Sequence, residues 1–83
     1  MNTTQTKISH LTKQELRVAE LVINGKTIKQ ISERLCISED TTRLHLMNLY
    51  RKMGVNKSTE MFKALLINGL IIITNQELKL LPK

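Results

Sequence analysis

Several residue types are scarce in this 83-residue chain, and each scarcity excludes a class of protein. A single cysteine cannot form an internal disulfide, and the two histidines have no acid or thiol at a spacing that would complete a metal site. No apolar run approaches the roughly 20 residues of a membrane span, and the start of the chain lacks the apolar segment of a secretory signal. We therefore expect a cytoplasmic protein without a metal or other cofactor.

Patterns that indicate catalysis are also missing. The sequence has no Ser/His/Asp arrangement and no glycine-rich phosphate loop. Aromatic residues make up only 2% of the chain, so Leu, Ile, Val and Met must form the core of one small domain. We expect a binding protein and not an enzyme.

Acidic residues are outnumbered, and the position of the excess positive charge is informative. Thirteen Lys or Arg and seven Asp or Glu give a formal net charge of +6 at pH 7. Between Lys26 and Lys57, seven basic residues stand against three acidic ones. Ordinary solvated surface can also carry extra lysine, but a concentrated excess favours an acidic partner such as nucleic acid.

Capping signals and apolar spacing predict four helices. Thr12 with Glu15 and Thr27 with Gln30 have the pattern of a capping box, and Ser38 is a good N-cap residue. Apolar residues recur three and four positions apart in each segment. The expected helices follow Thr12, Thr27, Ser38 and Lys57-Ser58, and they end near Asn24-Gly25, Cys36, Gly54 and Asn68-Gly69. We expect an all-α fold, a four-helix bundle containing a helix-turn-helix, with a short C-terminal extension.

The segment between Thr27 and Gly54 has the layout of a helix-turn-helix, whose second helix enters the DNA major groove. On that helix a stripe three and four residues apart faces the core: Thr42, Leu46, Leu49 and Met53. We expect the Thr42 hydroxyl to bond a carbonyl one turn back. We interpret Cys36, in the turn, as a small buried side chain. The opposite side mixes basic and apolar residues, which suits contact with base edges.

The C-terminal residues contain an apolar, largely β-branched run, Leu70 to Ile73, which would promote aggregation if it remained exposed to solvent. We expect part of it to pack on the helices and part to be covered by a second copy of the chain. The next four residues, Thr74 to Glu77, form another possible capping box, so a short helix can follow.

Positions distributed without gaps between Leu11 and Ile71, about three-quarters of the chain, carry a resemblance to a known family. They are Leu11-Thr12, Glu15, Leu21-Val22, Gly25, Lys29, Ile31, Leu35, Ile37-Ser38, Thr41, His45-Leu46, Asn48, Tyr50, Lys52, Gly54-Val55 and Thr59-Glu60. With them the chain resembles the LuxR/GerE-type DNA-binding domain of bacterial transcription regulators. We expect the stand-alone, GerE-like form, and the alternative is an effector domain excised from a larger regulator. The resemblance implies that the third helix enters the major groove and that the fourth dimerises. We therefore expect a flexible N-terminal tail at 1–10, the LuxR-type domain at 11–71 and a C-terminal extension at 72–83.

The outward residues of the helix-turn-helix are the candidate site. We hypothesise that base edges are contacted by Arg43, Leu44 and Met47, with Arg43 forming a bidentate contact to guanine. Phosphates would be contacted by Lys29, Thr41, Tyr50, Arg51 and Lys52. The dimer interface would consist of Lys63, Leu66, Ile67 and Leu70. Plain solvent exposure is the alternative for Arg51 and Lys52, and a protein contact is the alternative for Leu44 and Met47.

These expectations lead to two functional hypotheses. In the first, the chain is a sequence-specific DNA-binding transcription regulator, cytoplasmic and associated with the bacterial nucleoid when bound. Its partners would be double-stranded DNA, a second copy of the chain, and RNA polymerase or a larger LuxR-type regulator; no membrane is expected. In the alternative, a helix-turn-helix-like interaction module pairs with a larger LuxR-type regulator and inhibits it. The excess of basic residues around the third helix favours the first.

Overall fold

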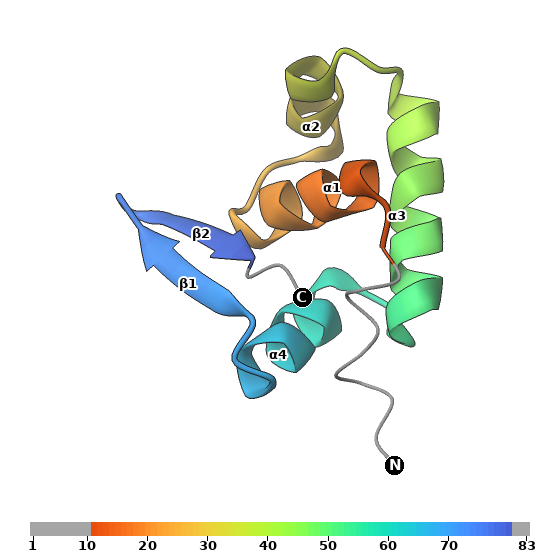
Figure 1. Ribbon diagram of the computed structural model, residues 1–83. Helices are drawn as coiled ribbons and strands as arrows, with labels where there is room; N and C mark the ends of the chain where they lie inside the picture. Colours follow the sequence, from red (N-terminus) through yellow and green to blue (C-terminus); the bar gives the residue numbers. More distant parts are fainter. Residues whose placement is uncertain (1–10, 81–83) are drawn as a thin grey trace.

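The computed structural model describes residues 11–80 as four helices and a two-stranded sheet (Figure 1). The predicted flexible tail at 1–10 lies outside the described residues. The elements are α1 (Lys13–Ile23), α2 (Ile28–Leu35), α3 (Glu39–Met53), α4 (Ser58–Ile67), β1 (Ile71–Thr74) and β2 (Glu77–Leu80). α1 is central, since it packs against α2, α3, α4 and β2. The hairpin lies on the side of α1 away from α3 (Figure 1).

The capping signals determine where three of the helices begin. The Thr12 hydroxyl accepts from the Glu15 backbone N–H at 3.1 Å, and the Thr12 N–H donates to the Glu15 carboxylate at 3.0 Å. The same reciprocal pair joins Thr27 and Gln30, and the Ser38 hydroxyl accepts from the N–H of the third residue of α3. α4 begins after Lys57 with no side-chain cap. These predicted starts are confirmed.

The prediction of a buried Cys36 is wrong. The residue is the C-cap of α2 and adopts a left-handed conformation with φ 59°. Its side chain is exposed. The short turn between α2 and α3 needs a positive φ at this position, so the chain reverses there and the next residue, Ile37, is the one that turns inward and is half-buried.

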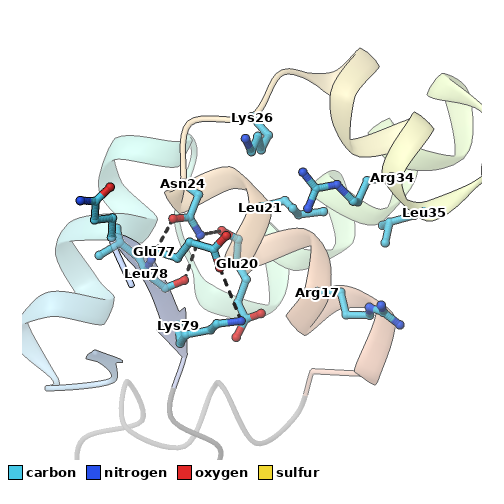
Figure 2. Close-up of a pocket in the computed structure, with 11 residues that line it drawn as sticks. Arg17, Glu20, Leu21, Asn24, Lys26, Arg34, Leu35, Glu77, Leu78 and Lys79 are labelled. Atoms are coloured by element: carbon cyan, nitrogen blue, oxygen red, sulfur yellow. Dashed lines mark hydrogen bonds and ion pairs between the residues drawn. The ribbon is translucent and has the colours of Figure 1, made fainter. Parts of the chain in front are cut away.

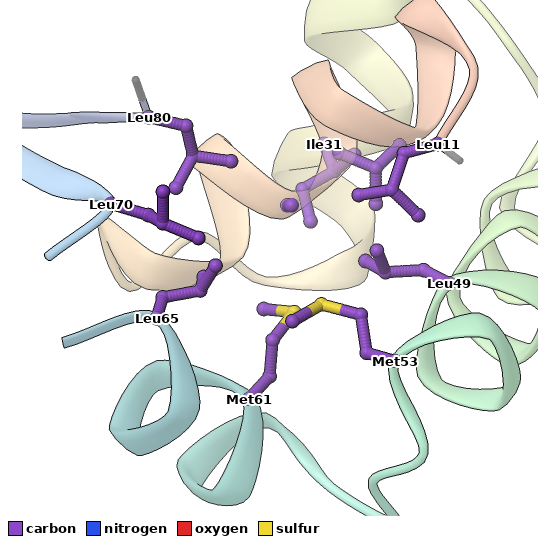
Figure 3. Close-up of a cluster of buried hydrophobic side chains, with 10 residues drawn as sticks. Leu11, Ile31, Leu49, Met53, Met61, Leu65, Leu70 and Leu80 are labelled. Carbon is purple, nitrogen blue, oxygen red and sulfur yellow. The ribbon is translucent and has the colours of Figure 1, made fainter. Parts of the chain in front are cut away.

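The core is formed where all four helices and both strands meet (Figure 3). Its fully buried side chains include Ile31, Leu49, Met61 and Leu65. Leu65 is buried in this core, whereas Leu66, a predicted dimer-interface residue, is exposed. Met61 and Leu65 are one turn apart and form the inner face of α4, so Leu66, the next residue along the helix, is rotated away from the core.

The four expected helices are present, but the fold is not entirely α-helical, because residues 71–80 form an antiparallel β-hairpin and not a short helix. Ile71 pairs with Leu80, and Thr74 pairs with Glu77 across a two-residue turn. The turn residues Asn75 and Gln76 both have positive φ, 51° and 67°, as in a type I′ turn. The β-branched run thus pairs with a strand that can bury Leu80 in the core, a long-range gain that a capping signal cannot outweigh.

Candidate nucleic-acid interface

α3 has one face in the core and one face in solvent. Thr42 and Leu49 are completely buried, whereas Leu44 and Met47 are 52% and 59% exposed. Two large apolar side chains on the outer face of a helix gain nothing from the fold, because they leave apolar surface in water. This face can therefore offer apolar contacts, such as those made with thymine methyl groups, beside the basic side chains of Arg43 and Arg51.

The two arginines of this face are held by neighbours on α3 itself. The Arg43 guanidinium lies 3.3 Å from the Asp40 carboxylate and 3.4 Å from the Glu39 carboxylate. Arg51 donates to the side-chain oxygen of Asn48. All of these groups except half-buried Asn48 are exposed, and exposed pairs of this kind contribute only about 0–1 kcal/mol. Arg43 can thus exchange its acidic neighbours for another acceptor at little energetic expense.

Other predicted phosphate contacts have different surroundings. Lys29 is exposed in the first turn of α2. Thr41 is half-buried, and its hydroxyl accepts from Ser38 at 2.9 Å in the first turn of α3. Tyr50 is half-buried; burial raises the pKa of its hydroxyl, and a hydrogen bond with the Ser58 side chain opposes that effect. Of these three residues only Lys29 carries a charge, and its side chain is exposed.

Lys52 has a structural partner that the sequence did not reveal. Its ammonium lies 2.9 Å from the carboxylate of Glu15, whose side chain is only 6% exposed. Burial by itself raises the pKa of Glu15, but the hydrogen bond and charge of Lys52, with the two hydrogen bonds to Thr12, outweigh it and lower the pKa. The pair joins the end of α3 to the start of α1. Lys52 therefore contributes to the fold whether or not it contacts a phosphate.

A second pair of polar side chains forms a buried contact between the two helices of the helix-turn-helix. The hydroxyls of Ser32 on α2 and Thr42 on α3 lie 2.6 Å apart and are buried. Thr42 also donates to the carbonyl of Ser38, one turn back, at 3.1 Å, as predicted. The contact fixes how α2 and α3 sit relative to each other, and so how the outer face of α3 is presented.

The residues that form this unit also match a known family. Residues 9–64 match GerE, the bacterial regulatory proteins of the luxR family, over more than half of the chain. The chain belongs to the luxR family. The predicted resemblance is confirmed, and the segment with the buried Ser32–Thr42 contact and the exposed face of α3 is a LuxR/GerE-type DNA-binding domain of transcription regulators.

Individual relatives support the same assignment. The luxR-family chain is 42% identical over 59 residues to "Spore germination protein GerE" of Bacillus subtilis, covering 71% of the chain and 80% of that protein. It is 37% identical over 59 residues to "Transcriptional regulatory protein DegU" of Brevibacillus brevis, covering 25% of that protein. It is 32% identical over 65 residues to "Uncharacterized response regulatory protein YgeK" of Escherichia coli, covering 44% of that protein. The chain thus spans most of GerE but less than half of the other two.

The family match ends at residue 64, before the hairpin begins. Three of the predicted dimer residues, Lys63, Leu66 and Ile67, are exposed on α4. The fourth, Leu70, is buried in the core next to Leu65 and Leu80 (Figure 3), so it offers almost no surface to a partner. Its burial follows from the hairpin, which turns the chain back toward α1 directly after α4.

A shallow pocket of about 330 Å³ separates the hairpin from the helix-turn-helix of this luxR-family chain (Figure 2). Basic side chains from α1, α2 and the loop between them line it, namely Arg17, Arg34 and Lys26. Within residues 11–80, no group of His, Cys, Asp and Glu is arranged to hold a metal ion. No helix in the same range is long and apolar enough to cross a membrane.

Proposed function

We propose that this luxR-family chain is a sequence-specific transcription regulator that inserts α3 into the DNA major groove and binds as a dimer. The observation that carries the proposal is the outer face of α3, where Leu44 and Met47 are exposed between two arginines. On the inner face Thr42, Leu49 and Met53 are buried and Leu46 is half-buried. A helix anchored on one side and apolar and basic on the other matches the chemistry of base edges and phosphates.

Arg43 is the proposed base reader. It lies in the first half of α3, the part of a recognition helix that meets base edges in helix-turn-helix complexes. Leaving Asp40 and Glu39 for guanine exchanges two weak exposed contacts for a bidentate one, which gives about 1–3 kcal/mol of discrimination against other bases. Leu44 and Met47 would contact thymine methyl groups beside it.

Arg51, Lys29, Thr41, Tyr50 and Lys52 are proposed to contact phosphates, which set register and carry the salt-dependent part of the affinity. Lys29 and Arg51 are exposed and can reach a backbone directly. Lys52 would have to share its ammonium between a phosphate and Glu15. Replacing it would therefore lower stability as well as affinity, so Arg51 is the better residue on which to test a phosphate role.

A dimer is proposed because a single helix-turn-helix contacts only one short half-site, and two half-sites about one helical turn apart provide specific affinity. The exposed residues of α4, Lys63, Leu66 and Ile67, supply a surface for it. The same exposed apolar residues favour the second candidate function, an interaction module that pairs with a larger LuxR-type regulator and inhibits it. The two candidates differ in whether the chain binds duplex DNA by itself.

The experiment is selection of bound sites from random duplex DNA, followed by affinity measurements on the selected site and on a scrambled duplex. Arg43→Ala should weaken binding to the selected site about 10- to 100-fold and leave the scrambled duplex nearly unchanged. Arg51→Ala should weaken both alike and reduce the slope of log affinity against log salt by about one. Arg17→Ala removes the same charge from the far side of α1 and is the matched control.

Two results would contradict the proposal. Equal weakening of both duplexes by Arg43→Ala would refute the division into base and phosphate contacts. No binding to any duplex at low ionic strength, together with capture of a larger LuxR-type regulator, would favour the inhibitory module.

A further inference from the structure

We propose that a second copy of this chain pairs with the free edge of β1, so that the two hairpins form one continuous antiparallel sheet about a two-fold axis at Ile72. The proposal rests on the proposed function in that it adds a backbone contact between the two copies of the regulator to the one proposed at the exposed residues of α4. It uses the hairpin, which lies beyond the segment that matches the family.

The outer edge of β2 is closed by side chains of α1 (Figure 2). The Leu78 N–H donates to the Asn24 side-chain oxygen at 2.8 Å, and the Asn24 amide donates to the Leu78 carbonyl at 2.9 Å. The Leu80 N–H donates to the Glu20 carboxylate at 3.0 Å. The backbone groups of Leu78 and Leu80 therefore point away from β1, and polar side chains satisfy both groups of Leu78 and the N–H of Leu80.

The register then determines which groups of β1 point outward. Ile73 is paired with Leu78 and Ile71 with Leu80, so their N–H and C=O groups point away from β2 as well, on the opposite edge. Within residues 11–80, no hydrogen bond satisfies these groups. The strand is Ile-Ile-Ile-Thr, without the charge, proline or glycine that usually protects an exposed edge. One edge of the hairpin is closed and the other is open.

A second copy fits this edge because the edge is complementary to itself. Only Ile71 and Ile73 present outward backbone groups, and an antiparallel arrangement satisfies both when Ile71 of one copy pairs with Ile73 of the other. In that register Ile72 faces Ile72 of the second copy across the two-fold axis. The two residues form a non-hydrogen-bonded pair, the type in which the side chains lie closer together. The arrangement is isologous, closes at two copies and brings no charged side chain opposite another.

The same pairing covers exposed apolar surface. Ile72 is 43% and Ile73 is 75% exposed in the single chain. Ile71 lies just after α4, so the Ile73 that pairs with it arrives near the end of α4 at which Leu66 and Ile67 are exposed. Four residues of strand are small beside the roughly 1,600 Å² of a standard interface, so we expect weak association in solution that two adjacent DNA half-sites strengthen.

The position of the hairpin is compatible with DNA binding. β1 and β2 lie on the side of α1 away from α3 (Figure 1), and β2 packs against α1. Joining two hairpins therefore leaves the outer face of both α3 helices exposed.

The test exploits the two-fold axis at residue 72. Ile72→Lys and Ile72→Glu each place like charges directly opposite one another in the dimer, and each should weaken self-association about tenfold or more in sedimentation equilibrium. An equimolar mixture should restore association, because lysine then faces glutamate. The exposed Cys36 thiol can carry a fluorophore on one variant so that mixed pairs are detected. Restoration cannot result from a fold that each substitution merely damages.

A second variant tests the backbone contact. Ile73→Pro removes an outward N–H that the β1–β2 ladder does not use, so the hairpin should persist by circular dichroism while self-association is lost. Lys79→Ala, on β2, is the control that should remain dimeric. Undiminished association of Ile72→Lys and Ile73→Pro, a mixture that fails to pair, or a wild-type chain that stays monomeric would each overturn the strand pairing.

DNA binding separates this inference from the proposed function. The Ile72→Lys variant should bind a duplex with one half-site as tightly as the wild type does, but it should lose the extra affinity that the wild type has for a duplex with two half-sites. That result would support both the regulator function and the strand pairing. If the wild type binds no duplex yet dimerises through β1, the regulator function fails and the strand pairing survives.

Discussion

Replacing Thr42 with valine tests how the two helices of the helix-turn-helix are held together. The Thr42 and Ser32 hydroxyls lie 2.6 Å apart, Ser32 donates to the Ile28 carbonyl at 2.7 Å, and Thr42 donates to the Ser38 carbonyl at 3.1 Å. Each hydroxyl has one proton, so these three contacts share two protons. When either hydroxyl is removed, the other still has a carbonyl acceptor.

The magnitudes follow from this geometry. Thr42→Val keeps the side-chain volume and removes one buried hydrogen bond, so it should lower the free energy of unfolding by about 1 kcal/mol. Ser32→Ala should have a similar effect. In each single variant the remaining hydroxyl keeps one hydrogen bond to its own carbonyl, and the double variant loses that bond as well, so we expect a total loss of about 2 kcal/mol with a coupling energy near zero.

Urea and thermal unfolding of the four proteins measure this coupling. Each kcal/mol corresponds to a shift in Tm of about 4–8 °C for a domain of this size. A total loss that differs from the sum of the two single losses by more than about 0.5 kcal/mol would show that the remaining hydroxyl does not bond to its own carbonyl. A valine variant as stable as the wild type would refute the assigned role of the Thr42 hydroxyl.

Three further predictions concern backbone conformation and pH. Cys36→Gly should raise stability by about 0.5–1 kcal/mol, because glycine adopts the left-handed C-cap conformation without strain; unchanged urea unfolding would contradict this. Gln76→Gly, which creates an Asn-Gly type I′ turn, should raise the protection of hairpin amides from hydrogen exchange several-fold, and unchanged protection would refute it. Because Lys52 and Thr12 lower the pKa of Glu15 in the folded state, its contribution is complete above the unfolded value of about 4.5 and is lost as the pH falls through the folded pKa. Urea unfolding from pH 7 to pH 3 should show a steeper loss for the wild type than for Glu15→Gln, and parallel curves would contradict the assignment.

Much of the fold could be predicted because its signals are local. The capping boxes at Thr12 and Thr27 act over three residues, and both are present in the structure. The two faces of α3 follow from helical spacing alone, which is why Leu44 and Met47 were correctly expected outside and Thr42 inside. For the same reason the outer face of α3, the centre of the candidate site, was predictable without coordinates.

The features that were missed depend on residues far apart in the sequence. Lys52 was interpreted only as an outward cation, but its partner Glu15 lies 37 residues earlier. Leu70 was expected in a dimer contact and is instead covered by the returning chain. The Lys52 contact forms only when two helices distant in sequence come together, and the burial of Leu70 depends on the hairpin that turns the chain back.

The sequence by itself determined where three of the four helices begin, which side of α3 faces outward and to which family the chain belongs, because these depend on contacts within about one helical turn and on a distributed pattern of residue types. Only the tertiary structure decided that residues 71–80 form a hairpin, that the free edge of β2 is hydrogen-bonded to the side chains of Asn24 and Glu20, and that the edge of β1 stays open. A run of isoleucines can join a helix or a strand, and the choice depends on whether a partner strand and a buried position for Leu80 exist nearby in space.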